Sequence, residues 1–323
     1  MAGPISEIIS TTLRNRSKAL ADNVSENNAL LKRLKRRGNV KLLDGGRTIF
    51  HELAYAENST YKRYSGYETL DISPSDVVTA AEFDWKQIAV AVTMSGLEQL
   101  QNSGREALLD LMESRIQVAE WTMANNMSTD IYSAGTADGS KQIGGLQLLV
   151  PDDPTTGTAG GINRATYSFW QSKLYDFSVE SATPSSTTIQ AALNTLYMRM
   201  ARGPDTPDLF IGDNVYFGYY WASLQSIQRI AKDDDATVGA GFERLRFMGA
   251  DFYLDGGAGG AAPASHVYGL NTKYLRLCAH KNRNMVPLDP DRYATNQDAV
   301  VKLIGWAGNL TTSWAAGQGV IIA

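Results

Sequence analysis

A single long helix is the feature that most restricts how this chain can fold. Two capping boxes, Ser95-x-x-Glu98 and Ser103-x-x-Glu106, precede a stripe of apolar residues at helical spacing that lasts about six turns. A helix of this length crosses most of a domain, so we predict that it is a structural spine with its methionines in the core. The stripe consists of Leu109, Met112, Ile116, Ala119, Met123, Met127 and Ile131.

Residues 39–93 have an extended character with few core positions. Asp44-Gly45-Gly46 lies between two strand-like runs, which is a hairpin signal. We predict a long two-stranded extension that projects from the body, and because an isolated hairpin is marginally stable in water, we expect it to lie on a partner. Aromatic and charged residues alternate along it without a single apolar face: Tyr55, Tyr61, Lys62, Arg63, Tyr64, Tyr67 and Glu68.

The N-terminal segment combines helical periodicity with positive charge. Residues 1–41 hold nine Lys and Arg against three acids, a charge of +6, which leaves the remaining 21 basic and 31 acidic residues at −10 and the chain at −4. An amphipathic helix, or two, is predicted to end at Gly38, and its charge favours contact with phosphate or an acidic surface, with a merely solvated face as the alternative. The apolar stripe is Ile5, Ile9, Leu13, Leu20, Val24, Leu31 and Leu34, and the basic cluster near the end is Lys32, Arg33, Lys35, Arg36 and Arg37.

The second half of the chain is predicted to be of the α/β type. Thr187-x-x-Gln190 is interpreted as the cap of a helix that Gly203-Pro204 stops, and Asn214 as the cap of a second helix through Ile230. Residues 136–163 are expected to be loops around one short strand, and the final GVIIA to be a strand held in a sheet. The inward face of the first helix is predicted to be Ile189, Leu193, Leu196 and Met200.

The stretch FYLDGGAGGAAP, residues 252–263, contains a literal match to the dinucleotide-binding fingerprint from Gly257 to Ala262. The fingerprint works where a strand turns directly into a helix whose amides hold a pyrophosphate. Here Pro263 interrupts, and SHVYGL, residues 265–270, is predicted to be another strand. We therefore interpret the glycines as a loop between strands and expect no cofactor.

Other signatures of chemistry are missing from the sequence. There is no G-x-S-x-G, P-loop or H-E-x-x-H motif, so no enzymatic activity and no metal site are predicted. The apolar runs are too short to span a bilayer and no leader opens the chain, so no membrane association is expected. Cys278 is expected to be a small buried residue, and the remaining candidate ligands are interpreted as turns or as surface and hydrogen-bonded side chains: Asp152, Asp153, Asp233, Asp234, Asp235, His51, His266 and His280.

The order of these parts, with the wording of several stretches, points to a known family. The stretches are ENSTYKRYSGYETL leading to FDWKQIAVAVTMSGLE, IGGLQLLVPDDPTTGTAGGINRATYSFW, PDLFIGDNVYFGYY, RLRFMGADFYLDGG and WAGNLTTSWAAGQGVI. Over roughly residues 40–323 the chain resembles the major capsid protein of tailed bacteriophages, the Hong Kong 97-type fold. The likeness is one of arrangement, without an invariant signature.

The resemblance implies an α+β fold with a definite division of the chain. The expected parts are a basic amphipathic N-terminal arm (1–40), an extended β-hairpin loop with the start of the peripheral domain (41–93), the peripheral domain with its spine helix (94–163), the axial domain (164–270) and the return strands of both domains (271–323).

The resemblance also implies a structural role as the shell protein of a virion, assembled in the host cytoplasm as pentamers and hexamers around double-stranded DNA. Scaffolding, portal and cement or decoration proteins are the expected partners. The basic cluster would face the lumen, toward a scaffold or non-specifically bound DNA, and residues 61–64 (Tyr61, Lys62, Arg63 and Tyr64) would contact a neighbouring subunit. Some relatives join subunits through Lys-to-Asn bonds, but no partner for Lys62 can be matched, so none is predicted. The alternatives are an encapsulin-type nanocompartment shell and a cytosolic α/β enzyme.

Overall fold

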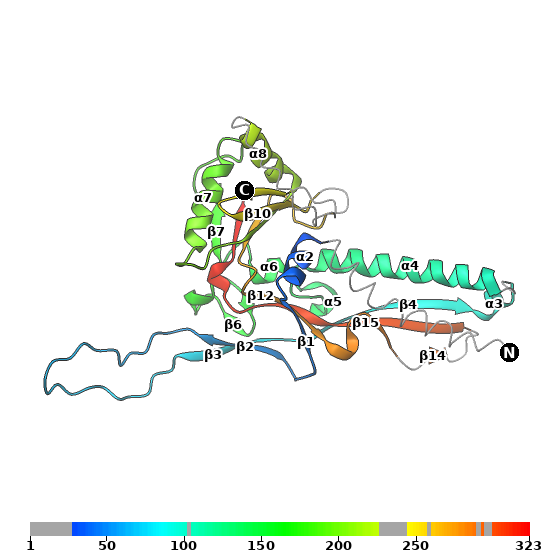
Figure 1. Ribbon diagram of the computed structural model, residues 1–323, viewed down its shortest axis with the longest axis horizontal. Coiled ribbons are helices and arrows are strands. Elements are labelled where there is room, and N and C mark those ends of the chain that lie inside the picture. Colours follow the sequence, from blue (N-terminus) through cyan, green and yellow to red (C-terminus); the bar gives the residue numbers. More distant parts are fainter. Residues whose placement is uncertain (1–27, 102–104, 226–243, 257–259, 289–291, 294–298) are drawn as a thin grey trace.

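Two mixed β-sheets organise the protein, which we describe from a computed structural model (Figure 1). The structure describes residues 28–323 except 102–104, 226–243, 257–259, 289–291 and 294–298. The first sheet contains β1 (Val40–Leu43), β4 (Lys86–Ser95), β12 (Leu275–His280), β13 (Val286–Pro287), β14 (Arg292–Tyr293) and β15 (Ala299–Thr312). The second contains β7 (Lys173–Asp176), β8 (Leu209–Gly212), β9 (Arg244–Phe247), β10 (Ala250–Leu254), β11 (Val267–Leu270) and β16 (Gly319–Ile322).

Strand β15 is the strand of the first sheet with which most of the others pair. It pairs antiparallel with β4 from Ala299–Ser95 to Gly308–Lys86, and with β12, β13 and β14 at successive places along its length. After a short 3-10 turn, η3 (Ala315–Gly317), the chain enters the second sheet as β16, between β7 and β11. The C-terminal strand is therefore held in a sheet, as predicted.

The spine helix is present as α4 (Arg105–Asp130), which packs along β4. Its stripe is buried at Ile116, Ala119, Met123, Met127 and Ile131, as predicted; the side chains of Leu109 and Met112 lie outside the described part. Long helices gain most of their stability from burying such a face.

The first of the two capping boxes forms as predicted. Ser95 and Glu98 exchange backbone-to-side-chain hydrogen bonds of 3.1 and 3.3 Å at the start of α3 (Gly96–Gln101), and Arg115 of α4 pairs with Glu98 at 2.7 Å. Hydrogen bonds from Arg115 and Ser95 lower the pKa of Glu98 to about 2, so this carboxylate stays ionised to low pH. The second predicted cap, at Ser103, lies outside the described residues.

The second sheet carries α7 (Ile189–Met200) and α8 (Asn214–Gln225), whose caps differ from the prediction. The predicted inward face of α7 is buried, but Gln190 donates to Ser223 instead of closing a box with Thr187. The cap of α8 is Asp213: its Oδ1 accepts from the Tyr216 amide at 3.0 Å and its Oδ2 from the Ser265 amide at 2.8 Å. Asn214 is the first helical residue of α8 and not its cap. The predicted end of this helix, at Ile230, lies outside the described residues.

Of two other predictions about local structure, one is wrong and one is right in part. The runs flanking Asp44-Gly45-Gly46 do not form a hairpin, because β1 pairs in parallel with β12 while β2 (Ile49–Ala54) pairs with β3 (Val78–Phe83). Gly45 and Gly46, with φ of 155° and 112°, let the chain turn from one sheet to the other. Residues 136–163 are mostly turns and loops, as predicted, but hold a strand pair in place of one strand. The short elements are α5 (Ala137–Ser140), which is interrupted by positive φ at Asp138 and Gly139, α6 (Leu146–Leu149), β5 (Thr158–Ala159) and β6 (Ile162–Asn163).

A buried polar network joins α4 to the chain around it. Asn28 caps α2 (Ala29–Arg36) through the Leu30 and Leu31 amides and donates to Ser128 of α4 at 2.9 Å. Just past α4, the Tyr132 hydroxyl donates to the carboxylate of Asp255 after β10. Burial raises the pKa of Asp255, an effect that the hydrogen bond from Tyr132 opposes.

Because the pKa of Asp255 is raised, the effect of Asp255→Asn on the free energy of unfolding should depend on pH. Since the folded-state pKa lies above the unfolded one, the contribution of Asp255 to stability is complete below its unfolded pKa and is lost as pH rises through the folded value. Asn keeps an acceptor for Tyr132 without the charge. Urea unfolding from pH 3.5 to pH 7 should therefore show the variant gaining stability relative to the parent as pH rises; a pH-independent difference would contradict this.

Candidate interaction surfaces

The projecting loop, residues 55–77, is the first candidate surface. Strands β2 and β3 connect the loop to the body, and the loop extends well beyond the body (Figure 1). Ile49 and Leu53 of β2 are buried, so one side of the β2–β3 pair at the base of the loop faces the core. The sequence did not predict this buried side. The last backbone hydrogen bond between the two sides is the one that the Tyr55 amide donates to the Val77 carbonyl, at 3.0 Å. Beyond this bond, large apolar side chains are exposed at Tyr61, Tyr64, Tyr67, Leu70 and Ile72.

In the described chain the loop has no buried core of its own, and polar contacts between its residues maintain its shape. Ser75 donates to Asn58 across the loop at 3.1 Å, and Lys62 forms an ion pair with Glu68 at 3.0 Å. Hydrogen bonds from Ser73 lower the pKa of Asp71. Arg63 lies 6.0 Å from the Tyr61 ring centroid and has no carboxylate partner in the described chain. The predicted residues 61–64 are thus together at an exposed site.

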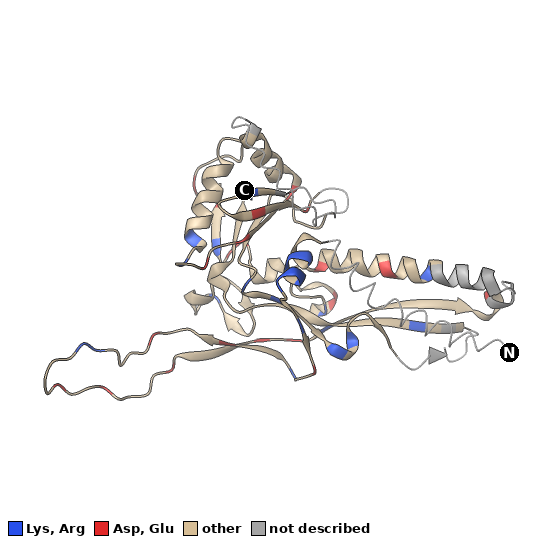
Figure 2. Ribbon diagram, viewed as in Figure 1, with Lys and Arg blue, Asp and Glu red and all other residues tan. Residues whose placement is uncertain are grey.

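The basic cluster at the end of α2 is the second candidate surface. Figure 2 shows these Lys and Arg residues gathered on one short helix. Leu30, Leu31 and Leu34 are buried, so this helix packs on the body, and it ends before Gly38, which has a φ of 68°. The predicted end of the helix is confirmed, whereas residues 1–27 of the predicted arm lie outside the described part.

Two of the basic side chains contact the body of the same chain. Arg33 pairs with Asp208 and Asp251, each at 3.1 Å, and Arg37 pairs with Asp208 at 3.2 Å. Asp208 also accepts from the amide and hydroxyl of Thr272, both at 2.7 Å. Asp208 precedes β8 and Asp251 lies in β10, so the arginines hold α2 against the second sheet. Sequence reasoning missed both carboxylates, because they are 175 and 218 residues from Arg33 and nothing local marks them as its partners.

Arg33→Gln is expected to lower the free energy of unfolding by about 1.5–3 kcal/mol, because Asp208 and Asp251 are largely buried and each loses a charged hydrogen-bond partner. Arg37 still pairs with Asp208 at 3.2 Å, and Arg246 lies 3.8 Å from Asp251, so neither carboxylate is left without a cation. Lys41→Gln is the matched control, since it removes the same charge from an exposed side chain of β1 and should cost less than about 0.5 kcal/mol. Chemical denaturation measures both. Equal effects would show that the Asp208 and Asp251 contacts do not stabilise the fold.

Among the remaining candidate ligands that the structure describes, His266 and Asp152 contact each other, and His51, His280 and Cys278 lie in other contacts. Burial lowers the pKa of His51, which hydrogen-bonds Thr311 at 2.9 Å; His266 contacts Asp152 at 3.0 Å, and His280 caps the turn η2 (Lys281–Arg283). Cys278 is buried, as predicted, and Asp153 closes a turn with Thr155. Asp233, Asp234 and Asp235 lie outside the described residues. Within the ranges described, no three His, Cys, Asp or Glu side chains form a group that could hold a metal ion.

In the described part of the chain, no helix combines the length and apolar character needed to cross a lipid bilayer.

Comparison with known proteins identifies the fold. No protein-family model and no curated protein matches the sequence. Among solved structures, the capsid asymmetric unit of cyanophage A-1(L) aligns over 88% of this chain and 90% of its own, with a TM-score of 0.59 at 16% identity. The capsid of Myoviridae phage XM1 aligns over 90% and 91%, with a TM-score of 0.52 at 9% identity. A structure from Mycobacterium phage Bobi aligns over 88% and 89%, with a TM-score of 0.52 at 10% identity.

The protein has the fold of the capsid subunits of cyanophage A-1(L) and phage XM1. It is an α+β chain of the Hong Kong 97 type, with the spine helix along one sheet, the helices α7 and α8 on a second sheet and a projecting two-stranded loop (Figure 1). The predicted fold class is confirmed.

Proposed function

We propose that this chain is a major capsid protein, which assembles as pentamers and hexamers into an icosahedral shell around the double-stranded DNA of a tailed bacteriophage. The observation that carries the proposal is the match to capsid subunits along about nine-tenths of both chains. We assign the chain a structural, non-enzymatic role in the virion, with assembly in the host cytoplasm. In this assignment the first sheet with α4 is the peripheral domain and the second sheet with α7 and α8 is the axial domain.

The projecting loop supports the proposal independently of the comparisons. Its exposed tyrosines and Ile72 have no core in their own chain, and such side chains favour an interface where a partner covers them. In a shell of identical subunits every loop has a neighbour to cover. We assign the contact to residues 61–64, with Tyr61 and Tyr64 as the apolar anchors.

The basic cluster is assigned to the lumen, as a sequence-independent contact with DNA or with an acidic scaffold. Lys35, Arg36 and Arg37 are exposed at the end of α2, and Arg33 and Arg37 also hold the helix to the body. The cluster therefore combines a structural and an electrostatic task. Portal and cement or decoration proteins are the further partners of such a shell.

The test is the size and shape of the purified chain. Size-exclusion chromatography and negative-stain electron microscopy should show pentamers, hexamers or closed shells in the megadalton range. A small, stable oligomer without ring or shell forms would contradict the proposal and favour the enzyme. Shells recovered from the native source with protein cargo and without DNA would favour the encapsulin-type compartment.

A further inference from the structure

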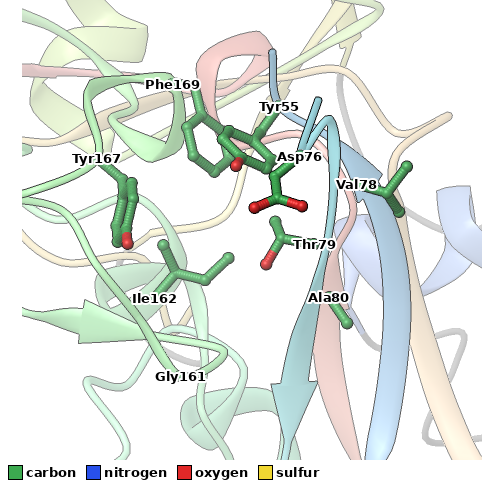
Figure 3. Close-up of a pocket in the computed structure, with 9 residues that line it drawn as sticks. All are labelled: Tyr55, Asp76, Val78, Thr79, Ala80, Gly161, Ile162, Tyr167 and Phe169. Carbon is green, nitrogen blue, oxygen red and sulfur yellow. The ribbon is translucent and has the colours of Figure 1, made fainter. Parts of the chain in front are cut away.

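An open pocket of about 380 Å³ lies where the projecting loop joins the body (Figure 3). One wall is β3 with the last residues of the loop, and the other is the segment from Gly161 to Phe169. Two hydrogen bonds of 2.9 Å fix the second wall: the Glu82 amide of β3 donates to Gly160, and the Trp170 indole donates to Ala159. Gly160 has a φ of 58° and lies so close to Phe83 that a Cβ would be 2.9 Å from its ring. The pocket is therefore part of the folded body.

The lining has the chemistry of a site for a cation. Phe169 lies between two tyrosines, with ring centroids 5.5 Å from Tyr55 and 5.9 Å from Tyr167. The Asp76 carboxylate points into the space that these rings border (Figure 3). In the described chain Asp76 has no hydrogen-bond or ion-pair partner. Aromatic faces beside an unpaired carboxylate favour a guanidinium, which can stack on a ring and pair with the carboxylate at the same time.

The same chain presents a guanidinium that has no carboxylate. Arg63 is exposed in the loop beside Tyr61, while its neighbour Lys62 already pairs with Glu68. Within one molecule the loop extends away from the pocket (Figure 1), and the Ser75–Asn58 and Lys62–Glu68 contacts hold its two sides together. The arginine and the pocket are therefore complementary between molecules.

We propose that the pocket formed by Tyr55, Asp76, Tyr167 and Phe169 receives Arg63 from the loop of a second copy of this chain. The inference rests on the proposed function, which supplies neighbouring copies, and it names the receptor on the neighbour. The contact is heterologous, loop tip to loop base, so each subunit gives one arginine and receives one, as a closed ring of subunits requires.

Charge reversal tests the pairing. Arg63→Glu and Asp76→Arg should each lower the yield of assembled particles at least about tenfold, because each variant places like charges at every contact. The double variant should return to within about threefold of the parent, since the pair is restored with its direction reversed. Glu57→Arg is the matched control, an equal change of charge at an exposed loop position outside the pocket, and should assemble like the parent.

Cross-linking tests the geometry separately from yield. Cys278 is the only cysteine and is buried, so introduced thiols react without background. Arg63→Cys and Asp76→Cys chains, co-expressed and treated with a short bismaleimide, should give a covalent dimer that neither variant gives alone.

The outcomes separate this inference from the function on which it rests. If the parent forms shells and Arg63→Glu assembles equally well, or if the double variant is not rescued and no dimer forms, the pocket is not the receptor although the shell proposal stands. If the parent forms no shell or capsomer, both are overturned.

Discussion

Ile116→Asp is expected to yield no soluble protein. Ile116 is fully buried at the middle of α4, which packs on strand β4 of the first sheet. Placing a carboxylate there leaves a charge without a partner in the core, which costs several kcal/mol, a large part of the roughly 5–15 kcal/mol that stabilises a domain. The soluble fraction after expression, followed by circular dichroism of any soluble material, measures the effect.

Val118→Asp is the control for this variant. Val118 lies two residues further along α4 and is 57% exposed, so the same carboxylate should change the free energy of unfolding by no more than about 0.5 kcal/mol. A soluble, natively folded Ile116→Asp protein would mean that this face of α4 is not packed as the structure shows.

Replacing residues 56–76 by Asn-Gly should leave a folded subunit that forms no shells. The ladder from Ile49–Phe83 to Ala54–Val78 remains, Tyr55 and Val77 stay opposite each other, and Asn-Gly closes a two-residue hairpin turn. The deleted residues contribute no side chain to the buried core, so the midpoint of thermal unfolding should change little. The apolar side chains proposed to cover the neighbour are removed, so electron microscopy should show no closed particles.

A companion variant separates the loop surface from its length. Tyr61→Ser combined with Tyr64→Ser keeps the loop and removes two of its exposed rings, so assembly should be strongly reduced with unchanged subunit stability. Normal shells from the shortened chain would exclude the loop as an assembly element and leave only the fold to support the proposed function.

The sequence alone determined those elements whose signals are local. The stripe from Ile116 to Ile131 is buried as its spacing predicts, because side-chain direction in a helix depends only on position along it. The Ser95–Glu98 box forms because both partners lie within one turn. The end of α2 before Gly38 and the terminal strand β16 follow from equally local signals. The projecting extension was predicted within residues 39–93 because aromatic and charged residues alternate from Tyr55 to Glu68 without a single apolar face.

Only the tertiary structure decided which distant elements meet. The run Val40–Leu43 looks equally able to pair with the strand that follows it, yet it joins β12, because the positive-φ glycines carry the chain to another sheet. Asp208 and Asp251 receive Arg33 across the fold, and the pocket unites residues 55 and 76 with residues 167 and 169. Such contacts leave no trace in local spacing, because many arrangements of the same helices and strands bury similar apolar area and only long-range packing selects one of them.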